Sequence, residues 1–461
     1  MSVKAGIVGL GEKMENELFE KMPISKAYFK LALPVVIGMV VSLVYNLADT
    51  WFIARTANTA LVAGVSLCAP VFTLMVAFSD IFGLGGSNLI SRLLGQKNQK
   101  GAAGVSAFSI YGSIGFGCLT ALVLLVLRTP ILTLLGAAED TLPYAMEYYT
   151  WLAVGAPIVI LNVVPGNLLR TEGLSGSAMI CTVIGAVLNI VLDPIFIYVL
   201  GLGAGGAALA TVLSNFISDI LLLITMKRKA STLSIRPSDC RISGAMPRDV
   251  LFIGIPASTT NIMQSLATLL TNRCLVSYGT DKVAALGIAM KINMICTLVL
   301  VGFAFGIQPA FGYCYGAGNE KRLKEFVRFD LKVLISLSAG FLVIAFVFSR
   351  PILQVFMSDA AVVNAGVTIL RCLMISGPAV GIVLALTTLF QAEGKAFAAF
   401  ILAFSRQGVV LVICLYGLRA VMGYIGILLA QPAADVLTVG IGLLLLRKTN
   451  ASVNHSSRML Q

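Results

Sequence analysis

The feature that most constrains this chain is a series of apolar runs, each about as long as the 20 residues a helix needs to cross a bilayer. There are twelve such runs. They fall near residues 31–54, 61–83, 105–127, 147–168, 176–200, 203–226, 250–275, 284–309, 331–349, 363–389, 396–418 and 423–446. The composition agrees, because 58% of the 461 residues are hydrophobic and only 12% are charged, whereas a soluble domain carries roughly 25% charge. The sequence therefore predicts an all-α integral membrane protein with twelve transmembrane helices.

The two halves of the chain resemble each other. Segments that recur at a nearly constant offset are 31–34 with 253–256, Gly83 with Gly306, Gly95 with Gly318, 171–173 with 392–394, and Gly203 with Gly423. Each half has an even number of helices and so enters the membrane from the same side, which predicts two six-helix lobes related by a pseudo-two-fold axis along the membrane normal. The predicted parts are an N-terminal segment (1–26), an N-lobe (27–226), a linker (227–249), a C-lobe (250–446) and a tail (447–461).

The distribution of basic residues predicts the orientation. Of the 33 lysines and arginines, 24 fall in segments on the side of the two termini, and only five fall in the opposite loops. Because cytoplasmic loops carry the excess of Lys and Arg, both termini are expected in the cytoplasm. The net charge of +12 is then a consequence of topology, and we expect no nucleic-acid partner.

Two carboxylates lie deep inside apolar runs, and each follows an asparagine by about one helical turn. These pairs are Asn46 with Asp49 and Asn189 with Asp193. A charged group at membrane depth costs about 2.5 to 3.5 kcal/mol on insertion scales, so it usually faces a cavity and has a function there. Thr211, across a short turn from Asp193, can lie at a similar depth. We therefore expect Asp49, Asn189, Asp193 and Thr211 to form a proton or cation coupling site, with Na⁺ as the candidate metal ion. Hydrogen bonds that only cross-link helices are the alternative.

The second half lacks this acidic set, since Asn46 and Asp49 correspond to Thr268 and Thr271. Other charges within helices are interpreted as structural, either paired or reaching toward the membrane surface. They are Asp80, Asp219, Asp435, Arg273, Lys291, Arg371 and Arg406. The candidate substrate-cavity residues are Asn46, Gln264, Met290, Lys291 and Asn293. Pro34 removes one backbone hydrogen bond from the first helix and predicts a bend there.

Motifs for enzymatic chemistry and for cofactors are missing from the sequence. The nine cysteines form no CxxC pair, and the single histidine, His455, lies in the polar tail. The Gly-rich segments at 83–86 and 201–206 follow no strand and precede no GK[ST], so they are not nucleotide loops. We therefore expect no enzyme and no cofactor other than a coupling ion, H⁺ or Na⁺.

These motifs make the chain similar to the multidrug and toxic compound extrusion (MATE) family. The strings that carry the resemblance are 45–50 (YNLADT), 83–87 with 91–95, Leu188-Asn189 with Asp193-Pro194, and 306–313. Carboxylates in helices 1 and 5, without one in helix 7, resemble the DinF-like and MepA-like branch. The resemblance implies a coupling site at Asp49, Asn189, Asp193 and Thr211, and a first helix that bends near Pro34.

The expected function is a secondary active antiporter of the bacterial cytoplasmic membrane, working as a monomer. It would export small amphipathic, often cationic organic compounds in exchange for H⁺ or Na⁺. The alternative is a lipid-linked oligosaccharide flippase of the related superfamily, which should line its cavity with several basic residues and often has extra helices.

Overall fold

A computed structural model describes residues 16–240, 244–356 and 359–459 of the chain. The side chains at 16, 261, 262, 265, 280, 281 and 449–459 are not described. Residues 1–15 of the predicted N-terminal segment, 241–243 of the linker, 460–461 of the tail and the His455 side chain thus lie outside the described part. Within that part, every regular element is a helix.

The first half of the chain contains η1 (Asn16–Lys21), α2 (Ile24–Arg55), α3 (Thr59–Leu67), α4 (Ala69–Gly95), α5 (Gln99–Val126), α6 (Arg128–Leu134), α7 (Leu142–Val154), α8 (Ala156–Thr171), α9 (Ser175–Pro194), η2 (Ile195–Val199), α10 (Gly203–Lys229) and η3 (Pro237–Cys240). The second half contains α11 (Met246–Val276), α12 (Thr280–Gly316), α13 (Glu320–Phe356), α14 (Ala360–Ile375), α15 (Gly377–Ala392), α16 (Ala396–Phe404), η4 (Ser405–Val409), α17 (Val410–Met422) and α18 (Tyr424–Met459).

These helices coincide with the twelve predicted spans. Ten segments of the described residues are long and apolar enough to cross a membrane, and α7 with α8, bent by 52°, supplies an eleventh. Helix α11, 31 residues long, covers the remaining predicted span at 250–275. The chain is therefore a multi-pass, all-α membrane protein.

Prolines break two of the spans at matching places. Helix α8 begins with Pro157 in its first turn, and α15 begins with Pro378 in its first turn. Proline is tolerated in a first helical turn because the backbone N–H it lacks would have no partner there. The predicted spans at 147–168 and 363–389 are therefore each built from two helices.

The internal repeat is also visible in the backbone. Gly173 and Gly394, which the repeat aligns, have φ of +76° and +78°. Gly203 and Gly423, a second aligned pair, have φ of +51° and +58°. Left-handed backbone strongly favours glycine because it has no Cβ. The two halves thus end and begin their helices with the same turns.

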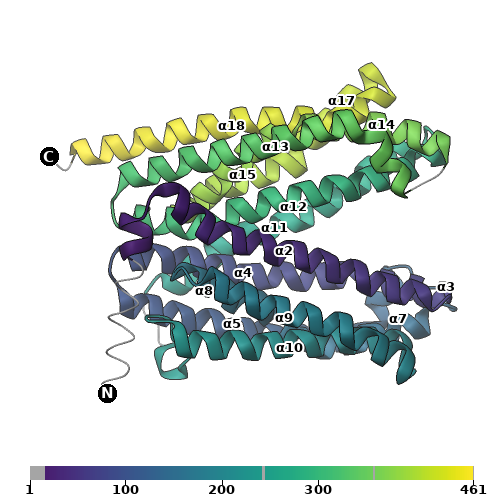
Figure 1. The fold of residues 1–461 in the computed structure, drawn as a ribbon, viewed down its shortest axis with the longest axis horizontal. Helices are drawn as coiled ribbons and strands as arrows, with labels where there is room; N and C mark the ends of the chain where they lie inside the picture. The colour runs from purple at the N-terminus through teal and green to yellow at the C-terminus, as the bar shows by residue number, and fades with distance from the viewer. Residues whose placement is uncertain (1–15, 241–243, 357–358, 460–461) are drawn as a thin grey trace. The chain divides into compact units, whose positions relative to one another are not determined.

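The chain folds into two compact units. The first unit comprises Met1–Ser258 with Gly306–Leu323, and the second comprises Thr259–Phe305 with Lys324–Gln461. In the first unit, α2, α9 and α10 run side by side (Figure 1). In the second unit, α17 packs along α18 (Figure 1). The lobe boundaries drawn from the sequence stay a prediction.

The short π-helix η1 is attached to the first unit by several contacts. Phe19 stacks on Tyr313 with ring centroids 4.8 Å apart, and the Tyr313 hydroxyl donates to Glu20 at 2.9 Å. Arg322 donates to the carbonyl oxygens of Phe19 and Met22. These contacts fix the start of α2 against the end of α12.

We predict that Gly173→Ala lowers the stability of the protein by about 1 kcal/mol or more, because its φ of +76° is strained for a residue with a Cβ. That Cβ would also lie 2.4 Å from a methyl group of Leu18. Gly176→Ala is the matched control, since nothing lies within 4 Å of its added Cβ. Thermal unfolding of the purified variants measures the difference. Equal midpoints for the two variants would contradict the prediction.

Candidate functional site

Three of the four predicted coupling residues meet between α9 and α10. The Asn189 side-chain amide donates to Asp193 Oδ1 at 3.3 Å and to Thr211 Oγ1 at 3.4 Å. Exposed fractions are 1% for Asn189, 0% for Asp193 and 7% for Thr211. Both hydrogen bonds are longer than the usual range of about 2.7–3.2 Å for an N–H donor to oxygen. The amide therefore links the carboxylate to the hydroxyl without holding either tightly.

Asp49 reaches the same region from α2. Its side chain is half-buried, and it interacts electrostatically with Asp193. Three buried oxygens here have no hydrogen-bond partner, namely Asp49 Oδ1, Asn189 Oδ1 and Asp193 Oδ2. Within the described residues, neither carboxylate forms an ion pair with Lys or Arg. The site thus holds acceptors in excess of donors, and a cation or a proton would satisfy them.

The donor set has the chemistry of a monovalent-cation or proton site. It offers two carboxylates, one amide oxygen and one hydroxyl, and oxygen ligands suit hard cations. No group of three or more His, Cys, Asp or Glu side chains within the described part could hold a metal ion. The donors at the site are all oxygen atoms, which suit a hard cation or a proton better than a transition metal that prefers nitrogen or sulfur ligands.

The turn between α9 and α10 is what sets these side chains at one depth. Helix α9 runs through Pro194 into the π-helix η2, and Gly201 and Gly203 then reverse the chain with φ of +65° and +51°. A Cβ on Gly206 would lie 2.7 Å from the Phe196 carbonyl oxygen, so the returning helix needs glycine there. This tight hairpin brings Thr211 back to the level of Asn189.

Two tyrosines near the site were not predicted from the sequence. Tyr148 on α7 is buried and interacts electrostatically with both Asp49 and Asp193. Tyr45, one turn before Asp49, interacts with the same two carboxylates. Tyr45 precedes Asp49 by four residues, so the i,i+4 spacing could have found it. Tyr148 carries no sequence signal, because only packing brings α7 to this region.

None of the described hydrogen bonds among Asn189, Asp193 and Thr211 includes Asn46. Its side chain is exposed, and its amide donates to the Ser42 carbonyl oxygen of its own helix at 2.7 Å. Whether Asn46 faces a substrate stays a prediction.

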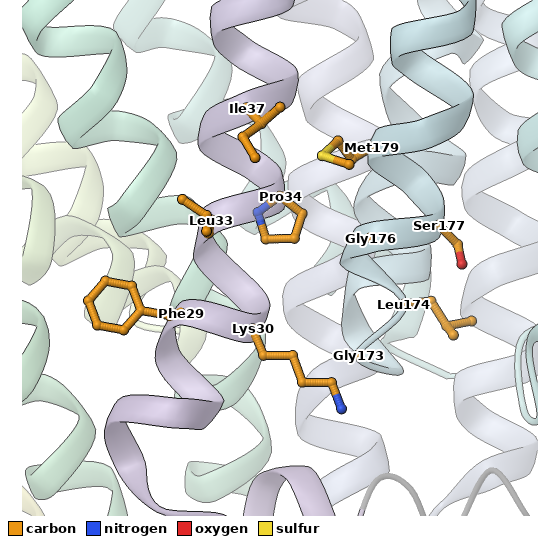
Figure 2. Close-up of a pocket in the computed structure, with 10 residues that line it drawn as sticks. All are labelled: Phe29, Lys30, Leu33, Pro34, Ile37, Gly173, Leu174, Gly176, Ser177 and Met179. Carbon is orange, nitrogen blue, oxygen red and sulfur yellow. The ribbon is translucent and has the colours of Figure 1, made fainter.

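Pro34 lies inside α2, which runs unbroken from Ile24 to Arg55. Beside it is a pocket of about 440 Å³ between α2 and the α8–α9 turn. Figure 2 shows Lys30 extending from α2 toward Gly173, with Met179 near Pro34. The pocket leaves space on one side of α2 at the proline, which is where a bend is predicted. The bend itself stays a prediction.

The other candidate cavity residues gather in the second unit. Gln264, Met290, Lys291 and Asn293 all line a cavity of about 570 Å³. Arg406, Gln431 and Asp435 line the same cavity. Volumes of about 300–1,000 Å³ are typical of pockets for small organic ligands. The four residues named from the sequence are thus brought together by α11 and α12.

Four of the remaining membrane charges, all read as structural from the sequence, have contacts with other residues. Arg406 Nε donates to Asp435 Oδ1 at 2.9 Å, forming a buried ion pair. Arg371 donates to the Phe346 carbonyl oxygen and lies over the Phe346 ring. Asp219 is buried and accepts a hydrogen bond from the Asn162 amide at 2.9 Å. No cation pairs with Asp219 within the described part.

Comparison with known proteins shows the family to which this architecture belongs. The family model MatE matches residues 34–195 and again 256–425, and the two matches start at Pro34 and Pro256, which the internal repeat aligns. The chain is 31% identical over 417 residues to "Multidrug export protein MepA" of Staphylococcus haemolyticus (strain JCSC1435), covering 90% of this chain and 92% of that protein.

Solved structures agree with the fold. A MATE in the bent conformation matches with a TM-score of 0.89 and 27% identity, covering 97% of this chain and 99% of that one. A MATE in the straight conformation matches with a TM-score of 0.88 and 27% identity, covering 96% and 99%. The predicted fold class is confirmed, and so is the resemblance stated from the motifs. The chain belongs to the MatE family of transporters.

Proposed function

We propose that this protein is a secondary active efflux antiporter that exports amphipathic organic compounds in exchange for H⁺ or Na⁺. The observation that carries the proposal is that two carboxylates, Asp49 and Asp193, interact with each other and have no basic partner among the described residues. Such carboxylates at membrane depth are costly unless they take up a proton or a cation. Ion-coupled transport requires a site of this kind, at which a proton or cation binds.

Multidrug export is proposed from the relatives and from the second-unit cavity. The similar MepA protein is described as a multidrug export protein. Most of the residues that line the cavity are apolar, and Met290, Met294 and Met374 are among them. Apolar walls bind ligands by buried area, and methionine side chains re-pack around varied shapes. This combination suits a range of amphipathic substrates.

In the proposed coupling step, Pro34 allows α2 to move. Proton or Na⁺ binding at Asp49 and Asp193 would stabilise one position of α2 against α9 and α10. A ligand shifts an equilibrium only by its different affinity for the two states, so cation and substrate must favour opposite forms. A bend of α2 at Pro34, beside the pocket at Lys30 and Met179, would be the movement that links the two.

We place the protein in the cytoplasmic membrane of a bacterium as a monomer with both termini in the cytoplasm. The 24 Lys and Arg residues on the side of the termini support this orientation. It would need no cofactor besides the coupling ion, and it would catalyse no chemical reaction. Transport into proteoliposomes, with pH and Na⁺ gradients imposed separately, tests the proposed function and identifies the ion.

We predict that Asp49→Asn and Asp193→Asn each abolish gradient-driven export while the protein still inserts in the membrane. Each substitution keeps the size of the side chain and removes the charge that draws the cation. Asp219→Asn is the matched control, because Asp219 is a buried carboxylate of the same unit that interacts with Asn162 instead. Proteoliposome export and protein level are measured for all three. Export at wild-type rate by either site variant would argue against a coupling role.

We also predict that the coupling cation and the substrate compete. Raising H⁺ or Na⁺ should weaken the binding of an exported dye, because cation and dye favour opposite forms. Dye affinity of the purified protein is measured with and without Na⁺ across about pH 5 to 9. This range lies between the ordinary pKa values of acidic and basic side chains. In Asp49→Asn the affinity should be flat. A flat wild-type profile, or an equal slope in the variant, would show that these carboxylates are not the coupling groups.

A further inference from the structure

The cavity in the second unit carries an excess of positive charge. Its charged lining residues are Lys291 on α12, Arg406 in η4 and Asp435 on α18. That is two cations against one carboxylate. Gln264, Asn293 and Gln431 add amide groups to the wall, while most other lining residues are apolar.

The carboxylate of the cavity is already neutralised by the protein. Asp435 Oδ1 accepts from Arg406 Nε at 2.9 Å and from the Gln431 amide at 3.0 Å. The Asp435 side chain is only 1% exposed, and its Oδ2 atom is buried without a hydrogen-bond partner in the described structure. A cationic ligand would have to displace Arg406 to reach this charge, and breaking a buried ion pair is strongly unfavourable.

The positive charges, in contrast, are left available. Lys291 is exposed and forms no ion pair or hydrogen bond within the described part of the chain. Arg406 uses only Nε in its described contacts, so its two terminal amino groups stay free to donate. Its side chain is 15% exposed, which leaves it accessible. Guanidinium groups match carboxylate and sulfonate geometry.

One further group in the wall lacks a partner. Gln407, next to Arg406, is 3% exposed, and its Oε1 atom has no hydrogen bond in the described structure. It lines the same cavity. Most buried polar side-chain groups have a hydrogen-bond partner. Because this oxygen is an acceptor, it does not itself attract an anion; it shows only that the wall beside the Arg406 guanidinium is polar.

We propose that this cavity binds amphipathic molecules through an anionic group, a carboxylate or a sulfonate, held by Lys291 and Arg406. The apolar body of the ligand would lie against the Met290, Met294 and Met374 side of the wall. The inference rests on the proposed export function and narrows its substrates to compounds that carry a negative group, including zwitterions. Organic cations without such a group would bind here more weakly.

The test uses dansylate, an aromatic sulfonate, and dansylamide, its neutral sulfonamide of nearly the same shape. Binding of each to the purified full-length protein in a neutral detergent is measured by equilibrium dialysis and corrected with protein-free micelles. We expect wild type to bind dansylate about tenfold more tightly than dansylamide, as a charge-assisted hydrogen bond allows. Lys291→Gln should remove most of this preference and leave dansylamide binding unchanged.

Lys332→Gln is the matched control, because Lys332 is an exposed lysine of the same unit that does not line the cavity. It should keep the wild-type preference. The inference is overturned if wild type binds both probes equally or neither, or if Lys291→Gln weakens both to the same extent. Gradient-driven export of ethidium and of dansylate by the wild type, assayed in parallel, tests the proposed function separately. Export of either probe leaves that function standing when the anion preference fails, and export of neither removes the function on which the inference rests.

Discussion

The structure depends on how charges inside the membrane are neutralised. A carboxylate in a medium of low dielectric needs a partner of opposite charge or a proton. In the C-terminal half this partner is fixed, because Arg406 on one helix is bound to Asp435 on another. In the N-terminal half no described basic residue pairs with Asp49 or Asp193. Under the proposed function, the partner there would be a proton or cation from solution, and occupancy of the site would follow the surrounding ion concentrations.

The two halves differ in this way although their backbones share the same turns. Gly173 and Gly394 have nearly the same left-handed φ, and so do Gly203 and Gly423. At the position that matches Asp49, however, the second half has Thr271, whose hydroxyl donates to the Ala267 carbonyl oxygen of its own helix. Thr271 carries no charge, so this position lacks the strong attraction that a carboxylate exerts on a cation. The repeat therefore preserves the architecture, while a few side chains give each half a separate chemistry.

The sequence predicted well what depends on local pattern. Run length and hydropathy identified the spans, and the i,i+4 spacing placed Asn189 and Asp193 within hydrogen-bond distance. The sequence-based prediction was less successful where a side chain can bond either to its own helix or to another residue. Asn46 shares a helix face with Asp49, yet its short amide bonds to the Ser42 carbonyl, as Asn side chains often do. The Arg406–Asp435 pair and the approach of Tyr148 could not be predicted, because they depend on how separate helices pack.

The carboxylate in the cavity of the second unit is paired with an arginine, whereas the two carboxylates in the first unit have no basic partner. This difference would assign substrate binding to one half and cation binding to the other. If Asp435 were unpaired, the coupling cation could bind in the substrate cavity itself. With Arg406 bound to Asp435, the cation has its best acceptors at Asp49, Asn189 and Asp193, where three oxygens lack donors. In the proposed mechanism, cation and substrate would bind different side chains, and a change in helix position would couple them. Helix α2 carries both Asp49 and Pro34, so a cation bound at one end of this helix can act on the proline that lies about four turns away.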